Sequence, residues 1–168
     1  RHTRLRTVTG VQTCALPIFH ELVEGRKLVL GGVEIPHSKG LDGHSDADAL
    51  MHAITDAVLG AIGEVDIGHF FPNTDPRWRG APSRIFLEEA AKQVKARGGR
   101  IVNIDDSMMA EKPKIFPHLQ QMKSNIASAL GVDVKKVGVK ATTNERLGFI
   151  GREEGIAAMA VATVDLPE

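Results

Sequence analysis

Hydrophobic and polar positions along this 168-residue chain follow two rhythms, one typical of strands and one of helices. Short runs rich in branched apolar side chains, bounded by Gly or Pro, predict strands. These strands are expected at 27–30, 33–36, 100–110, 136–141 and 155–166, with a Gly31-Gly32 turn between the first two. Segments with apolar residues three and four positions apart predict helices. The helices are expected from near Ser45 to near Gly60, from Ser83 to Arg97, and from Pro117 to Leu130.

Local signals mark the ends of these helices. Ser83 is the expected N-cap of the second helix, Gly98-Gly99 ends it, and Gly131 ends the third. Strands and helices alternate, so the fold class is α/β or α+β, with helices covering a sheet. Residues 63–80 are rich in Gly, Pro, Asp and Asn and are expected to form a loop, and loops of this length are often functional.

Composition narrows the class of protein. The length indicates one domain, and 42% hydrophobic and 25% charged residues are ordinary for a globular chain. A net charge of zero indicates no nucleic-acid partner and no anionic membrane surface, and no apolar run is long enough for a transmembrane helix. The single cysteine, Cys14, excludes an internal disulfide framework and is typical of a reducing compartment, so a cytoplasmic protein is expected.

The first nineteen residues differ from the rest. They hold three arginines and no Asp or Glu, whereas all 21 acidic residues follow them. Residues 7–18 resemble a translated sequencing-adapter read, so we interpret 1–19 as a non-native or disordered segment before a catalytic domain at 20–168. A poorly ordered natural extension is one alternative. The other is the remnant of a transit peptide, which would indicate a plastid protein.

The most informative stretch is His44-Ser45-Asp46-Ala47-Asp48-Ala49-Leu50-Met51-His52. His44, Asp48, His52 and Asp56 recur every four residues, which on a helix places them on or near one face. Ser45 followed three residues later by Asp48 is a plausible N-cap signature. The stretch therefore offers metal-type ligands beside a helix N-terminus suited to an anion. The alternative is an ordinary solvated polar face.

A second constellation spans 139–152, where a strand leads into Thr142, Thr143, Glu145 and Arg152. Hydroxyls and backbone amides can hold phosphate oxygens, arginine can clamp them, and a Glu can hold a hard cation such as magnesium. The alternative is a polar hairpin loop. Two weaker segments are 110–116, with two lysines around a proline that could meet a phosphate or a base, and 66–76, which could shape a small polyol pocket.

Taken together, these segments closely resemble the 2-C-methyl-D-erythritol 2,4-cyclodiphosphate synthases. The resemblance covers residues 20–165 and rests on several motifs in the right order. The motifs are Gly31-Gly32-Val33 with Ile35-Pro36, Gly40-Leu41 before His44-Ser45-Asp46, Asp66-Ile67-Gly68 with Phe71-Pro72 and Thr74-Asp75-Pro76, Pro113-Lys114, and Lys140-Ala141-Thr142-Thr143 with Gly148-Phe149 and Gly151-Arg152.

The resemblance implies a small single α/β domain, a mixed sheet with helices on one face, that assembles as a homotrimer with sites between subunits. It implies a lyase of the non-mevalonate (MEP) pathway of isoprenoid and terpenoid biosynthesis. That enzyme converts 4-diphosphocytidyl-2-C-methyl-D-erythritol 2-phosphate into the cyclic diphosphate and releases CMP. The substrate's 2-phosphate attacks its own β-phosphorus, so the enzyme must position the substrate and neutralise charge.

The resemblance also implies roles for individual residues. Zn²⁺ would be bound by His20 and His52, and Mg²⁺ or Mn²⁺ by Glu145, while His44 and Thr143 would stabilise the transition state. The expected substrate-binding residues are Ser45, Asp66, Ile67, Gly68, Phe71, Pro72, Asn73, Thr74, Asp75, Ala110, Glu111, Lys112, Pro113, Lys114, Ile115, Phe116, Thr142, Asn144, Phe149 and Arg152. Among them, Ala110 to Phe116 would form the cytidine pocket.

One departure from the family pattern concerns the zinc site. The family has an Asp-x-His pair, but the residue two before His20 is Ile18, so one carboxylate ligand is missing. Catalytic zinc usually has three protein ligands and an open position. We therefore expect this chain to bind zinc weakly and to be impaired, unless a residue such as Asp46 replaces the missing ligand. The glycine-rich first strand of the family is also replaced.

Two other interpretations remain. The chain could be a non-catalytic trimeric protein that binds a metal or nucleotide on the same fold, which the loss of a zinc ligand favours. Lys114, Thr143, Glu145 and Arg152 favour an enzyme, because metal binding alone requires none of them. A fragment of a fusion with the preceding cytidylyltransferase of the pathway is a third possibility, although residues 1–19 show no such domain.

Overall fold

The computed structural model describes residues 10–14 and 17–167. Within these residues, six strands form one mixed sheet with the order β5-β2-β8-β6-β7, and β1 pairs with the other half of β8. β6 and β7 are parallel, and every other pair is antiparallel. These strands are β1 (Gly10–Cys14), β2 (Ile18–Glu24), β5 (Lys39–Leu41), β6 (Arg100–Met109), β7 (Val137–Thr142) and β8 (Gly155–Asp165). The mixed α/β fold expected from the sequence is confirmed.

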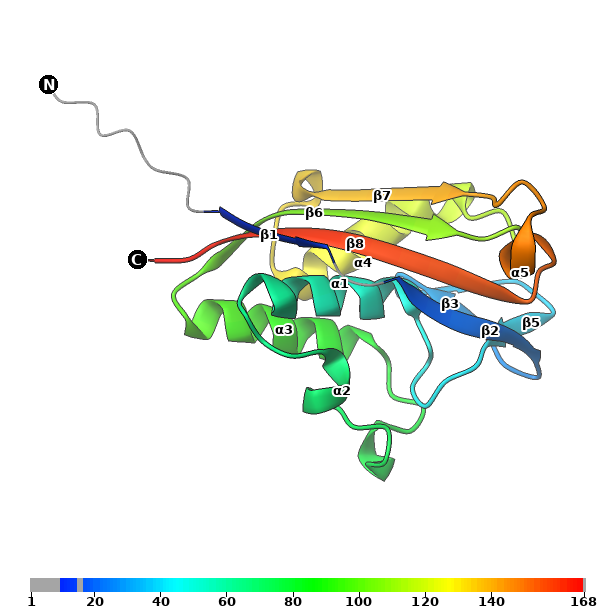
Figure 1. Ribbon diagram of the computed structural model, residues 1–168, viewed down its shortest axis with the longest axis horizontal. Coiled ribbons are helices and arrows are strands. Elements are labelled where there is room, and N and C mark those ends of the chain that lie inside the picture. The colour runs from blue at the N-terminus through cyan, green and yellow to red at the C-terminus, as the bar shows by residue number, and fades with distance from the viewer. Residues whose placement is uncertain (1–9, 15–16, 168) are drawn as a thin grey trace, which may run out of the picture.

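Three long helices lie on one side of this sheet, as Figure 1 shows. They are α1 (Ala49–Ala61), α3 (Arg84–Ala96) and α4 (Leu119–Leu130). A separate hairpin is made of β3 (Leu28–Leu30) and β4 (Val33–Ile35). The remaining elements are short, namely α2 (Ile67–Phe70), α5 (Gly148–Gly151) and the 3-10 turns η1 (Pro76–Trp78), η2 (Phe116–His118) and η3 (Val134–Lys136). No described helix is long and apolar enough to cross a membrane.

Alternation along β8 explains how the core forms between the sheet and the helices. Ile156, Ala158, Ala160, Ala162 and Val164 are buried on the face toward the helices, and Met159 on the other face is 36% exposed. The three alanines of β8 lie against α1, which is itself rich in buried alanine, so that helix and sheet approach closely. The other face of the sheet carries exposed side chains such as Asp105 and Lys140.

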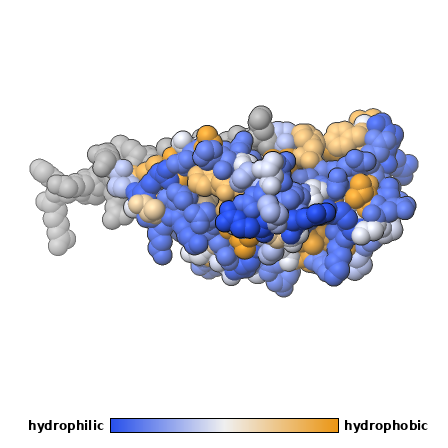
Figure 2. Space-filling view, turned by 90° about the horizontal axis from the view of Figure 1, so that it is seen from below, coloured by the Kyte–Doolittle hydropathy of each residue, from blue (hydrophilic) through white to orange (hydrophobic). Residues whose placement is uncertain are grey.

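The helical face has the surface of an ordinary globular protein. Figure 2, which views the molecule from below, shows a mainly hydrophilic surface interrupted by small hydrophobic patches. The largest exposed apolar side chains belong to other parts of the chain, and Phe116 (82%) and Leu147 (68%) are the most exposed of them.

The start of α1 differs from the prediction. The helix begins at Ala49, and its N-cap is Asp48, whose carboxylate accepts a hydrogen bond from the Met51 backbone N–H at 3.1 Å. Ser45 lies in the preceding bend and does not cap the helix. The carboxylate of Asp48 also accepts bonds from the backbone N–H groups of Gly31 and Gly32, so a contact distant in sequence fixes the helix start.

Other elements agree with the prediction to within a few residues, with three exceptions. Strands β2 and β5 were not predicted, because a mixed run such as Ile18–Glu24 carries a weak pattern. Residues 63–80 contain the short helices α2 and η1 rather than only loop. Residues Gly10–Cys14, inside the segment interpreted as non-native or disordered, form a strand paired with β8; the origin of that segment stays a prediction.

Candidate active site

A cavity of about 530 Å³ lies between the N-terminal end of α1 and the 67–74 segment. It brings together two sequence segments that were singled out separately, the histidine-carboxylate run and the 66–76 segment. The residues that line it are His20, Gly43, His44, Ser45, His52, Ile67, Gly68, Phe71, Pro72, Asn73, Thr74, Trp78 and Phe86.

Two imidazoles converge at this cavity from different elements. His20 projects from β2 and His52 from the first turn of α1, and Nε2 of His20 lies 3.2 Å from Nδ1 of His52. Burial lowers the pKa of His20, and burial together with the neighbouring His20 lowers the pKa of His52 to about 3. Both rings are therefore neutral at physiological pH, which is the form that binds metals.

The geometry of this pair fits a tetrahedral metal. Two nitrogens that each lie about 2.0–2.1 Å from a tetrahedral zinc ion are about 3.3–3.4 Å apart, close to the observed separation. Among the described residues, however, no three His, Cys, Asp or Glu side chains are grouped as a metal site. Ile18 stands two residues before His20, on the same side of β2, and packs against the hydrophobic core.

Asp46 is not free to replace the missing ligand. Its Oδ2 accepts the backbone N–H of Ser83 at 3.0 Å, and its Oδ1 accepts the hydroxyl of Ser83 and the N–H of Asp48. All of these bonds hold the carboxylate in the loop between β5 and α1. The substitution by Asp46 considered from the sequence therefore has no support in this geometry.

His44 and Ser45 lie in the loop before α1 rather than on the helix. His44 Nε2 donates to the backbone carbonyl of Asp75 at 3.0 Å, and its own carbonyl accepts from Gly80. Ser45 is buried, and its Oγ lies 3.2 Å from Nε2 of His52. The expected stripe of His44, Asp48, His52 and Asp56 on one helix face is thus wrong, since only the last two belong to α1.

Several side chains shape the wall of the cavity. Asp56 accepts the N–H of Ile67 at 2.8 Å, which ties α2 to α1, and burial raises the pKa of Asp56. Phe71, Trp78 and Phe86 form an aromatic cluster with ring centroids 4.5–6.1 Å apart. Of the residues expected to bind substrate here, Asp66 and Asp75 do not line the cavity: Asp66 caps α2 and Asp75 pairs with Arg77.

The other predicted residues form a second cluster at the far end of the sheet. One carboxylate oxygen of Glu111 accepts the N–H groups of Asn144 and Arg146, at 3.2 and 3.3 Å, so the 110–116 and 142–152 segments touch. Thr143 Oγ1 lies 3.4 Å from a carboxylate oxygen of Glu145. The remaining predicted residues of this cluster are Ala110, Lys112, Pro113, Lys114, Ile115, Phe116, Thr142, Phe149 and Arg152.

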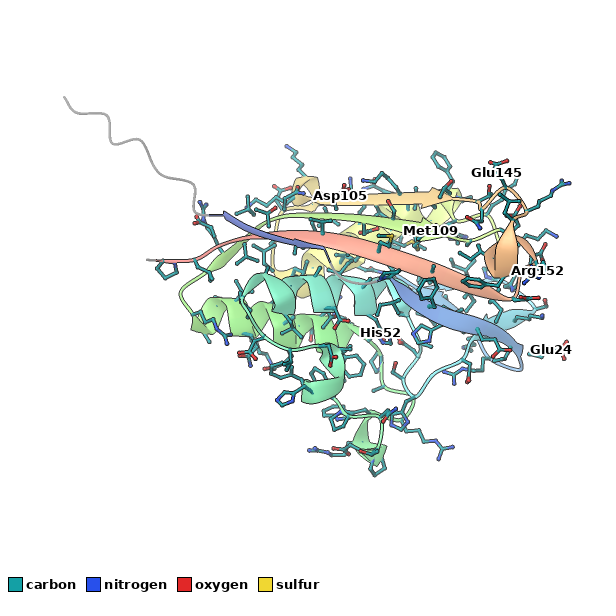
Figure 3. The ribbon with its side chains drawn as sticks, viewed as in Figure 1. Glu24, His52, Asp105, Met109, Glu145 and Arg152 are labelled. Carbon is teal, nitrogen blue, oxygen red and sulfur yellow. The ribbon has the colours of Figure 1, made fainter. Side chains whose placement is uncertain are left out.

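This second cluster is separate from the histidine cavity. Figure 3 shows Glu145 and Arg152 around α5, away from His52 at the start of α1. Its side chains are largely exposed, and Arg152 is paired with Glu154 at 2.9 Å. Phe149 packs edge-on against Phe19 of β2 at 5.7 Å between ring centroids. Phe149 and His20 together line a further cavity of about 540 Å³, so the two clusters approach each other there, whereas none of residues 110–116 and 142–146 lines either cavity that includes His20.

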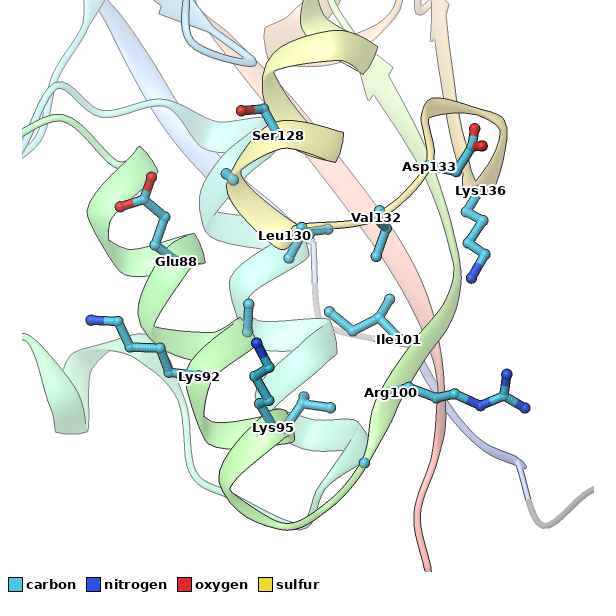
Figure 4. A pocket seen from close by; sticks show the side chains of 15 residues that line it. Glu88, Lys92, Lys95, Arg100, Ile101, Ser128, Leu130, Val132, Asp133 and Lys136 are labelled. Atoms are coloured by element: carbon cyan, nitrogen blue, oxygen red, sulfur yellow. The ribbon is translucent and has the colours of Figure 1, made fainter.

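A larger groove of about 560 Å³ lies elsewhere, where α3 and α4 end (Figure 4). Its polar rim includes Lys92, Lys95 and Lys136 together with Glu88 and Asp133. Lysines at helix C-termini complement the partial negative charge of the terminal carbonyl groups. None of the predicted site residues lines this groove, so the smaller cavity with the two histidines is the candidate active site.

Sequence reasoning missed three features of this site. Trp78 and Phe86 line the cavity, and Ser83 was predicted only as a helix cap. Arg26 donates to the backbone carbonyls of Gly43 and Ser45, at 2.7 Å each, and so holds the loop that carries His44. No local signal marks the roles of Arg26 and Ser83, because each depends on contacts across 17 or more residues.

The fold and the site define a small mixed α/β protein in which a pair of neutral histidines lies at a cavity with aromatic walls. The chain belongs to the YgbB family, whose model matches residues 18–165. It is 57% identical over 146 residues to a 2-C-methyl-D-erythritol 2,4-cyclodiphosphate synthase from Dechloromonas aromatica, covering 87% of this chain and 91% of that protein. The family membership inferred from the sequence is thereby confirmed.

Longer relatives and a ligand-bound structure complete the comparison. The chain is 57% identical over 149 residues to the bifunctional enzyme IspD/IspF of Sphingopyxis alaskensis, covering 89% of this chain but only 38% of that enzyme. A solved CDP-bound form of 2C-methyl-D-erythritol-2,4-cyclodiphosphate synthase superimposes with a TM-score of 0.83 at 38% identity. That match covers 92% of this chain and 99% of the other.

Proposed function

We propose that this chain catalyses the cyclisation of 4-diphosphocytidyl-2-C-methyl-D-erythritol 2-phosphate to 2-C-methyl-D-erythritol 2,4-cyclodiphosphate. An oxygen of the 2-phosphate bonds to the β-phosphorus, the bond from that phosphorus to the bridging oxygen breaks, and CMP leaves with that oxygen. The observation that carries the proposal is the convergence of His20 and His52, 3.2 Å apart, at a cavity lined by His44 and Ser45. Family membership supports the same reaction.

Zn²⁺ is the metal that suits the histidine pair, and His20 and His52 would hold it. When bound, such an ion polarises a phosphoryl oxygen. Around it, His44 and Ser45 would contact the diphosphate, and His44 is held in place by its bond to the carbonyl of Asp75. The rigid wall of Phe71, Trp78 and Phe86 would exclude water from the reacting groups.

The methylerythritol portion would lie along the cavity wall formed by the 66–75 segment. Ile67, Gly68 and the 71–74 residues face this space, so they are the best candidates for contacts with its carbon skeleton and hydroxyls. Asp66 and Asp75 would act mainly through the backbone that they cap, since each accepts a bond from a nearby N–H group.

The cytidine half of the site would come from the second cluster. Residues 110–116 would hold the cytosine and ribose, and Thr142, Thr143, Asn144, Phe149 and Arg152 would contact the phosphates or complete the pocket. Glu145 would bind Mg²⁺ or Mn²⁺, since a carboxylate is a hard-cation ligand, and Thr143 would stabilise the transition state beside it.

Because residues 110–116 and 142–146 do not line the histidine cavity of their own chain, we propose that these residues and the histidines meet across subunit interfaces of a homotrimer. The open face of the sheet, with Met159 at 36% exposure, offers the surface for this assembly. Phe116 and Leu147, which lie in or beside the second cluster, are large apolar side chains that are mostly exposed in a single chain. Contact with a neighbouring subunit would remove them from water. Each complete site would take His20, His44 and His52 from one subunit and residues 110–116 and 142–152 from its neighbour.

The missing carboxylate at Ile18 gives a direct test. We expect Ile18→Asp to raise CMP release from the diphosphocytidyl substrate at least tenfold in the presence of zinc and magnesium, because the variant restores a third zinc ligand. The parent chain and an Ile18→Asn variant, which offers a weaker ligand of the same size, are the controls. Equal rates of CMP release by the parent chain, Ile18→Asp and Ile18→Asn, all folded, would contradict the proposal that position 18 supplies a zinc ligand.

The second candidate is a trimeric protein that binds a metal or a nucleotide without turnover. The absence of a third metal ligand among the described residues favours it. Calorimetric titration with CDP separates the candidates: a binder retains CDP affinity while neither the parent chain nor Ile18→Asp releases CMP. A rate that rises in Ile18→Asp identifies the enzyme.

A further inference from the structure

Ser83 occupies the N-cap position of α3 without capping the helix. Its side chain makes no hydrogen bond to the first turn of α3, and the residue is fully buried. Its Oγ instead lies 2.7 Å from Nε2 of His52 and bonds to Oδ1 of Asp46. A serine in this position normally binds the backbone of its own helix. Here its hydroxyl instead contacts the side chains of Asp46 and His52, which lie more than 30 residues earlier in the sequence.

Asp46 is held so that its carboxylate can only accept from this serine. Its Oδ2 accepts the backbone N–H of Ser83 at 3.0 Å, its Oδ1 accepts the N–H of Asp48 at 3.2 Å, and its own N–H donates to the carbonyl of Ala81. An ionised carboxylate has no proton to give. The proton between Ser83 and Asp46 therefore comes from the Ser83 hydroxyl.

This direction determines the proton on His52. Because the hydroxyl proton of Ser83 is engaged by Asp46, the same Oγ accepts at its 2.7 Å contact with His52, and Nε2 of His52 is the donor; Ser45 Oγ, 3.2 Å from the same nitrogen, is a second and longer contact. A neutral imidazole carries one N–H, so Nδ1 keeps its lone pair. That lone pair points toward Nε2 of His20, 3.2 Å away.

We propose that Ser83 and Asp46 are positioning residues that hold His52 in the Nε2–H tautomer and aim its Nδ1, together with Nε2 of His20, at one divalent metal ion. The inference extends the metal site of the proposed function. Outer partners of this kind fix the ring and the tautomer of metal-binding histidines, and their loss typically lowers metal affinity about 10–100-fold. Neither residue touches the substrate or the metal in this proposal.

The first test uses metal-free protein and does not depend on catalysis. Long-range ¹H–¹⁵N correlation spectra of the histidine rings at pH 7.5, in the presence of a chelator, distinguish Nε2–H from Nδ1–H. We expect the parent chain to show His52 as Nε2–H. Ser83→Ala should show a substantial Nδ1–H population, because the shorter acceptor is lost, the hydroxyl of Ser45, 3.2 Å away, can then donate to Nε2, and Nδ1 can donate to His20. A parent His52 in the Nδ1–H form, or no change in Ser83→Ala, overturns the proposal.

Asp46→Ala is the second variant. It removes the acceptor of the Ser83 hydroxyl proton, which can then turn toward Nε2 of His52 and again favour Nδ1–H. Competition titrations with Zn²⁺ should show about 10–100-fold weaker binding for both variants. Ser128→Ala removes another hydroxyl, exposed and bonded to Arg84, and should match the parent protein in both measurements.

Circular dichroism and thermal melting show whether each variant is folded, and only folded variants are compared. Unchanged zinc affinity in both folded variants contradicts the positioning role. If the parent chain and Ile18→Asp release no CMP but His52 responds to Ser83→Ala as expected, the proposed reaction fails while the positioning role stands.

Discussion

At the scale of single residues, Asp106 is the least expected feature of the core. It is 2% exposed on the helix-facing side of β6, and neither of its carboxylate oxygens has a hydrogen-bond partner among the described residues. Burial, reinforced by the charge of Asp105, raises its pKa to about 8. A buried carboxyl group without partners destabilises a fold, and the folded protein reduces this cost by keeping the group protonated.

The consequence is a stability that falls as the pH rises. The folded pKa of about 8 lies above the ordinary value of 3.8 for an aspartate, so the unfolded chain releases the proton at lower pH than the folded one. The contribution of Asp106 is therefore least unfavourable below about pH 4, worsens between pH 4 and 8, and is fully unfavourable above pH 8. Asp48, buried with a pKa raised to about 7 by desolvation, acts in the same direction.

We expect Asp106→Ala to raise the free energy of unfolding by about 2 kcal/mol at pH 8.5, with a gain that shrinks toward pH 5. Urea unfolding at the two pH values measures this difference. Glu34→Ala is the control, because Glu34 is an exposed carboxylate that pairs with Lys27 at the surface and is not among the charges that shift the pKa of Asp106. If Asp106→Ala raises the free energy of unfolding equally at both pH values, the pKa of Asp106 is not raised in the folded protein.

At the scale of elements, the loop between β5 and α1 is fixed from several sides. Arg26, in the turn after β2, donates to the carbonyls of Gly43 and Ser45, and its guanidinium also lies 3.7 Å from Asp42. Hydrogen bonds from a charged donor are among the stronger ones in proteins. The loop can therefore present His44 and Ser45 to the cavity without belonging to a helix.

We expect Arg26→Gln, in the Ile18→Asp background, to lower kcat for CMP release about tenfold and to lower the stability by about 2 kcal/mol, since two charge-assisted bonds are lost. Steady-state kinetics and urea unfolding measure the two effects. Lys27→Gln is the control: Lys27 pairs with Glu34 at the surface, and such pairs contribute little. Equal kinetics for the two variants would show that the loop keeps its geometry without Arg26.

At the scale of the whole molecule, the proposed active site is complete only when subunits assemble. Residues 110–116 and 142–146 line neither cavity that includes His20, and the second face of the sheet is covered by none of the three long helices (Figure 1). Light scattering after size exclusion should give a mass of about 54 kDa, three times the 18.1 kDa of the chain.

We expect Met159→Lys to shift this mass toward the monomer, because it introduces a charge into the middle of the open sheet face. Val65→Lys is the control, since Val65 is also exposed, at 52%, but lies in the loop after α1. A parent chain that runs as an 18.1 kDa monomer at micromolar concentration would contradict the trimer and the shared site.

The sequence by itself determined the class of fold, most of the long elements and the chemical groups of the site. Repeated apolar positions, glycine stops and the order of the motifs are local properties, and they predicted α3, β6, α4, β7 and β8 within a few residues. The residue types of the 44–52 run likewise indicated metal and anion chemistry, and the family resemblance added His20 as a metal ligand.

Only the tertiary structure decided how these groups are arranged. Asp48 rather than Ser45 starts α1, because its carboxylate is satisfied by Gly31 and Gly32 from a hairpin 16 and 17 residues earlier. Ser83 reaches His52 across 31 residues, and His20 meets the same ring across 32. Buried polar groups form hydrogen bonds with whichever residues the fold brings near them. A local sequence pattern does not identify these distant partners.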